Sequence, residues 1–155
     1  MHIIRIIFAG IARFLIGLVF LAGAFNKILH WHETERNLHA VLSEWQSNMA
    51  FSDYAYESFS FLIPITPVLL LLALVMELLG ALSILLGVKE KWGAWLLVLF
   101  LVPTTVIMHQ FWSVDPSMRE QQLAHFLKNM AILGGLIVVI LQGIQQKSKN
   151  PFPKF

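Results

Sequence analysis

The chain has 155 residues, of which 57% are hydrophobic and only 13% are charged, and its mean hydropathy is +0.71. Soluble domains carry roughly 25% charged residues, so this composition places the chain among membrane proteins. The net charge of +2 comes from scattered lysines and arginines without a dense basic patch, which argues against nucleic-acid binding. The chain has no cysteine, which excludes disulfides, thiolate metal sites and thiol chemistry by the chain itself.

Four apolar stretches are long enough to cross a bilayer, because about 20 helical residues cover roughly 30 Å of hydrocarbon. They are residues 4–29, 65–87, 92–112 and 123–144. The first continues to Leu29 without a small-residue cleavage site, so we expect a retained span and not a signal peptide. Backbone groups find no partners in lipid, which makes stretches of this length helices. The sequence therefore predicts one all-α domain over 1–155, an integral membrane four-helix bundle.

The basic residues are unevenly divided between the two sides of this bundle. The start of the chain, the turn VKEK and the tail 145–155 share one side, which holds Arg5, Arg13, Lys89, Lys91, Lys147, Lys149 and Lys154. The other side has only Lys27, Arg36, Arg119 and Lys128. Because positive charge favours the cytoplasmic side, we expect a multi-pass protein of the cell (inner) membrane with both termini in the cytoplasm.

The long outer loop, residues 30–64, has an amphipathic pattern of its own. Leu38, Val41, Leu42, Trp45 and Met49 recur at helical spacing with polar residues between them. This pattern predicts an interfacial helix on the outer leaflet, between the first and second spans.

Several polar residues fall inside the spans, and Glu77 is the one charge in LLLLALVMELLGALSILLG. Charged residues at such depth usually pair with each other or serve a function. Helical stripes and depth place six residues in the outer half of the bundle: Lys27, Glu77, Thr105, His109, Lys128 and Asn129. We expect a polar pocket there, in which the lysines hold an anionic or carbonyl oxygen and His109 donates or relays a proton. Two alternatives stay open: Glu77 couples protons to transport, or these residues only hold the helices together.

Two further groups lie away from that pocket. Arg13 is in the inner leaflet, where we expect a polar contact with Gln142, Ser83 or the carbonyls of a helix end. His32, Glu35 and His39 have spacing that would suit a metal on one helix face, but a solvated polar helix start is a far commoner explanation of this pattern. We therefore expect no bound metal.

Four segments in order resemble the DoxX-like family of small four-span membrane proteins, whose wider clan includes the surfeit-type cargo receptors. They are RFLIGLVFLAGAFNK, with Arg13, Phe20 and Lys27; ELLGALSILLG, from Glu77; PTTVIMHQFW, with His109; and HFLKNMAILGG, with Asn129 and Gly134. The family often has glycine where Ala24 stands, and here the glycine is Gly23.

Some members of that family are linked to thiol or sulfur oxidation and to quinone reduction, so the resemblance implies quinone contact, scaffolding or transport for a chain without cysteine. We expect an accessory membrane protein that binds a quinone or lipid-like ligand and supports a membrane or periplasmic redox partner. An enzyme would have to be a quinone-linked oxidoreductase subunit that receives electrons from a partner.

Overall fold

The computed structural model describes residues 2–149, with the side chains of 3, 4 and 6–143, and within that part of the chain the fold is all-α. Its helices are α1 (His2–Leu29), α2 (Trp31–Asn48), α3 (Asp53–Leu62), α4 (Thr66–Leu85), α5 (Glu90–Met108) and α6 (Pro116–Lys149). The four longest apolar helices, α1, α4, α5 and α6, are able to cross a membrane, which confirms the predicted architecture. Residues 150–155 of the predicted tail lie outside the described part.

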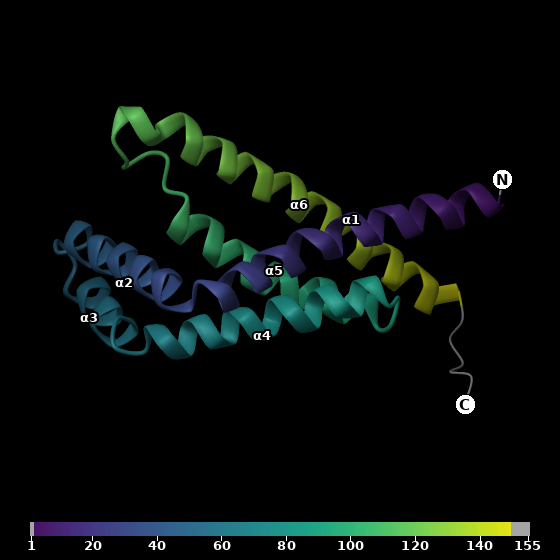
Figure 1. The fold of residues 1–155 in the computed structure, drawn as a ribbon, viewed down its shortest axis with the longest axis horizontal. Helices are drawn as coiled ribbons and strands as arrows, with labels where there is room; N and C mark the ends of the chain where they lie inside the picture. Colours follow the sequence, from purple (N-terminus) through teal and green to yellow (C-terminus); the bar gives the residue numbers. More distant parts are fainter. Residues whose placement is uncertain (1, 150–155) are drawn as a thin grey trace.

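The spanning helices pack in a row: α1 against α4, α4 against α5, and α5 against α6. Figure 1 shows that α1 begins, α4 turns into α5 and α6 finishes at one end of the bundle, called here the terminal end. The opposite end, called the loop end, carries α2, α3 and the segment 109–115. The start of α1 and the finish of α6 therefore share one end, as an even number of spans requires.

Small residues allow the helices in the centre of the row to approach closely, as is typical of packing in lipid. A Cβ on Gly80 of α4 would lie 2.9 Å from the carbonyl oxygen of Gly93 on α5, so the two backbones nearly touch. Leu85 of α4 packs directly on Gly17 of α1. The side chains of Ala81, Ala94 and Leu97 are completely buried around these contacts.

The outer loop contains two helices where the sequence predicted one. The predicted face of α2 is confirmed: Leu42 is buried, and Trp45 donates a hydrogen bond from Nε1 to the carbonyl of Ile107 at 3.2 Å. The second helix, α3, begins after Ser52, whose Oγ accepts a hydrogen bond from the backbone N–H of Ala55 at 3.4 Å. Phe59 of α3 stacks on Trp45 with a ring separation of 6.1 Å. The two helices thus form a hairpin at the loop end of α5.

The third and fourth spanning helices, α5 and α6, have different bounds from the predicted spans. The helix α5 ends at Met108 and not at the predicted residue 112, so His109 lies at its C-terminus, outside the helix. The helix α6 begins at Pro116, seven residues before the predicted residue 123, because proline suits the first turn of a helix. It continues to Lys149, and its 34 residues exceed what the hydrocarbon layer requires.

Candidate functional site

The deepest polar contact joins α1 to α4. Lys27 Nζ lies 2.8 Å from Glu77 Oε2, and the whole Glu77 residue is only 3% exposed. The same ammonium lies 5.2 Å from the centre of the Phe100 ring, a cation–π contact. The Lys27 side chain keeps 19% of its surface exposed. The sequence had placed Lys27 and Glu77 in one polar group, and in the structure these two residues form an ion pair.

A second polar contact joins α5 to α6. Asn129 donates from Nδ2 to Thr105 Oγ1 at 3.0 Å, and the Thr105 hydroxyl in turn donates to the carbonyl of Leu101. Both Thr105 and Asn129 are buried. Thr105 and Asn129 therefore form a buried hydrogen bond that links α5 to α6.

A third group, also near the loop end, contains His109. Its Nδ1 donates to Gln122 Oε1 at 2.9 Å, and its ring stacks on that of His125 at 5.2 Å. Lys128 is exposed and donates to His125 Nδ1 at 3.2 Å. No hydrogen bond or ion pair between described residues links Lys128 to the Lys27–Glu77 pair. The six residues expected in one outer pocket thus form three separate groups.

At the terminal end, Arg13 pairs with Glu90 and not with Gln142, Ser83 or a helix-end carbonyl. Two contacts form the pair: Nη2 to Oε1 at 2.7 Å and Nε to Oε2 at 3.0 Å. This forked geometry is typical of a strong arginine–carboxylate interaction. Ser83 uses its hydroxyl for the carbonyl of Val88 instead. The sequence analysis missed Glu90, although an acid in the VKEK turn lies at the end of the bundle where Arg13 was expected.

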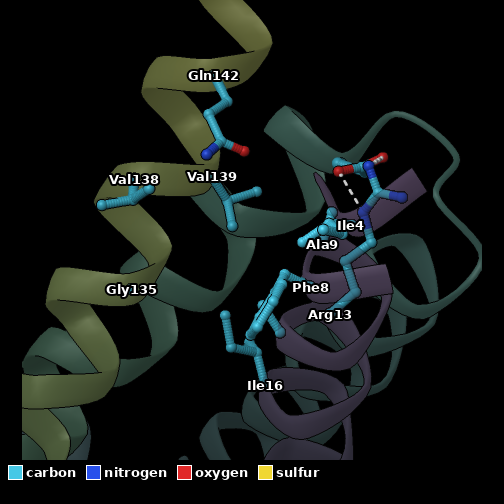
Figure 2. Close-up of a pocket in the computed structure, with 11 residues that line it drawn as sticks. Ile4, Phe8, Ala9, Arg13, Ile16, Gly135, Val138, Val139 and Gln142 are labelled. Carbon is cyan, nitrogen blue, oxygen red and sulfur yellow. Dashed lines mark hydrogen bonds and ion pairs between the residues drawn. The ribbon is translucent and has the colours of Figure 1, made fainter. Parts of the chain in front are cut away.

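A groove of about 740 Å³ lies at the terminal end, between α1 and α6. Its walls include Phe8, Ala12 and Ile16 of α1 and Gly135, Val139 and Gln142 of α6. Figure 2 shows the side chains of the two helices facing each other across this space, with Arg13 at its edge. The groove exists because α6 packs mainly on α5, and approaches α1 near Ile16 and Gly135.

A smaller cavity of about 210 Å³ adjoins the groove and is more polar. Arg13, Glu90 and Gln142 line both cavities, and the smaller one adds Lys89, the N-cap of α5, and Lys91 in the first turn of α5. Gln142 therefore lines both cavities beside Arg13, and it is not the hydrogen-bond partner of Arg13 that the sequence had predicted.

The comparison with protein families decides what kind of protein carries these features. The family model described as DoxX matches residues 8–110. The chain belongs to the DoxX family. No curated protein and no solved structure matches it.

The DoxX match begins at residue 8, within α1, continues just past the end of α5 and stops before α6. It includes the Lys27–Glu77 pair, the Arg13–Glu90 pair and His109. Lys128 and Asn129 lie beyond it, as does the segment HFLKNMAILGG. The family region thus supplies one wall of the groove, and the other wall comes from the part of the chain outside the match.

The possible metal residues on α2 lie at the surface. His32 Nδ1 is 3.8 Å from Glu35 Oε2, and the His32 side chain is 88% exposed. Within residues 2–149, no three histidine, aspartate or glutamate side chains form a group suited to a metal ion.

Proposed function

We propose that this DoxX-family chain is an accessory membrane protein that holds an amphipathic ligand, a quinone or a lipid, in the groove between α1 and α6. The observation that carries the proposal is the groove itself. Its volume of about 740 Å³ falls within the range of small-molecule sites, and its mainly apolar walls end at Arg13 and Gln142. A ligand with an apolar body and an oxygen-bearing end fits this distribution.

The groove supports ligand binding better than the polar residues near the loop end do. Glu77, Thr105 and Asn129 are buried and already hydrogen bonded to one another or to Lys27. A ligand would have to break these contacts, whereas the groove is open space. The proposed ligand site therefore lies at the terminal end of the bundle, where α1 begins and α6 finishes.

The proposed role is to bind and to support a redox or envelope partner in the membrane, and not to catalyse a reaction alone. Because the chain has no cysteine, a thiol-based reaction would require the partner's sulfur. A quinone held beside Arg13 would have its carbonyl near a donor that could stabilise negative charge.

The test is to extract the purified protein with solvent and to identify co-purifying quinones and lipids by mass spectrometry. Ala12→Phe fills the groove, and Ala22→Phe is the matched control, since Ala22 is exposed on the same helix outside the groove. We expect Ala12→Phe to lower the retained ligand several-fold and Ala22→Phe to leave it unchanged. Absence of any retained ligand, together with no thermal shift on adding quinone or lipid, would overturn the proposal.

A specific observation also favours proton-coupled transport as a second candidate. Glu77 is buried near the middle of α4, and its partner Lys27 is partly exposed, so protonation of the carboxylate would free the lysine. Glu77→Gln keeps the shape and removes the titratable group. Normal stability with lost pH-dependent flux would support transport, and unchanged flux would refute it.

A further inference from the structure

We infer that the ligand of the α1/α6 groove is an anionic phospholipid, whose phosphate lies among Arg13, Lys89 and Lys91 and whose acyl chain follows the groove. This inference rests on the proposed function, because it names the class of ligand that the same groove takes.

The two adjoining cavities have the polarity of a phospholipid. The groove is walled by apolar side chains of α1 and α6, whereas the smaller cavity is lined by charged groups and glycine backbone. Arg13, Glu90 and Gln142 belong to both, so the change from apolar to polar occurs at these residues. A molecule that extends through both cavities needs a long apolar part and a compact polar head.

The charge of the smaller cavity selects an anion. Its lining has three cations, Arg13, Lys89 and Lys91, and one carboxylate, Glu90. The Arg13–Glu90 pair uses Nε and Nη2 of the guanidinium and leaves Nη1 outside the fork. That nitrogen is directed toward Gly87, where a Cβ would lie 3.8 Å from it. Phosphate oxygens accept hydrogen bonds from such a donor, and the two lysines add a positive field.

The backbone of the turn also indicates that Lys89 is kept for its charge. Lys89 has a φ of 52°, a left-handed conformation that glycine or asparagine adopts with less strain. Gly87, two residues earlier, has a φ of 68° and is glycine, as expected. A strained lysine at the N-cap of α5, lining the polar cavity, suggests that its ammonium has a function there.

The experiment uses the full chain in detergent micelles, titrated with an equimolar mixture of phosphatidylglycerol and phosphatidylcholine that have identical acyl chains. Native mass spectrometry reports which lipid is bound. We expect phosphatidylglycerol to be preferred and the preference to weaken as salt rises. Lys89→Asn and Lys91→Gln should each reduce phosphatidylglycerol binding about fivefold, the effect of one basic residue near an anionic head group. Arg119→Gln, at the opposite end of the bundle, is the charge-matched control and should have no effect.

The melting temperature separates a role of Lys89 in lipid binding from a role in stability. Asparagine tolerates the left-handed position, so Lys89→Asn should keep or raise the melting temperature while it lowers phosphatidylglycerol binding. Glu90→Gln removes the competing carboxylate and should strengthen phosphatidylglycerol binding, the opposite sign to the lysine variants.

Equal binding of the two lipids, or a preference for phosphatidylglycerol that neither salt nor the lysine variants reduce, would overturn the inference but leave a groove ligand in place. Binding of an added quinone without phosphatidylglycerol would do the same. Absence of lipid and of quinone would overturn both the inference and the proposed function.

Discussion

Gly23 of α1 provides the space in which the carboxylate of Glu77 lies: a Cβ at position 23 would be 2.5 Å from Glu77 Oε1. Lys27, one helical turn further along α1, reaches back to the same carboxylate at 2.8 Å. A glycine and a lysine four residues apart thus make room for the acid and neutralise it. Glu77 therefore packs against Gly23, which lies one position before Ala24, the site where DoxX-like chains often have glycine.

Gly23→Ala is expected to destabilise the protein. The added methyl group displaces the Glu77 carboxylate from Lys27, and forced overpacking of this kind costs about 1–3 kcal/mol. Gly10→Ala is the matched control on the same helix, because a Cβ there meets nothing within 4 Å. It should be neutral or slightly stabilising. Thermal unfolding in detergent measures both variants, and equal melting temperatures would contradict the close approach at Gly23.

Removing Lys27 alone should cost more than removing both charges. Lys27→Met leaves Glu77 buried without a counter-charge, which in buried pairs costs about 3–5 kcal/mol. Combining it with Glu77→Gln removes the unpaired charge and should restore part of that loss. A double-mutant cycle of unfolding free energies checks the expectation. Additive single effects would show that the pair contributes no coupling energy.

The positions of Lys27 and Glu77 were largely predictable from the sequence, because hydropathy gives the depth of a residue in the membrane and helical spacing gives the direction of its side chain. Both properties can be read from one helix at a time, which is why the four spans and the placement of Lys27 and Glu77 in one polar group were predictable from the sequence alone. The same pattern did not show that His109 and Lys128 form a separate group with Gln122 and His125. Direction and depth do not give the distance between helices.

The features that were missed depend on tertiary crossing or on short segments. The groove depends on how α6 packs mainly on α5 and approaches α1 near Ile16, a tertiary arrangement that no single helix encodes. α3 has only ten residues and no buried side chain, so its segment is shorter than the one that identified α2 and carries a weaker sequence signal. Gln110 is only 4% exposed although it lies in a polar loop, where sequence gives no sign of burial.

The buried Thr105–Asn129 hydrogen bond should couple α5 to α6 modestly. Hydrogen bonds between membrane helices average about 0.6 kcal/mol in double-mutant cycles, because the separated helices find other partners. Thr105→Val keeps the shape and removes the acceptor, and Asn129→Leu removes the donor. We expect a cycle of these variants to give a coupling energy near that average. A value near zero would show that the contact at 3.0 Å adds no stability.

The expected orientation of the chain can be measured because it has no cysteine of its own, which gives labelling experiments no background. Val88→Cys introduces a thiol at the terminal end, where the native residue is 58% exposed, and Tyr54→Cys introduces one at the loop end, where it is 84% exposed. A membrane-impermeant maleimide should label Tyr54→Cys in cells with an intact inner membrane, and Val88→Cys only after permeabilisation. The reason is that Lys89, Lys91 and Arg13 gather at the terminal end, which positive charge keeps in the cytoplasm. Labelling of Val88→Cys in intact cells would reverse the assignment. The cationic cavity beside Arg13 would then be assigned to the opposite leaflet.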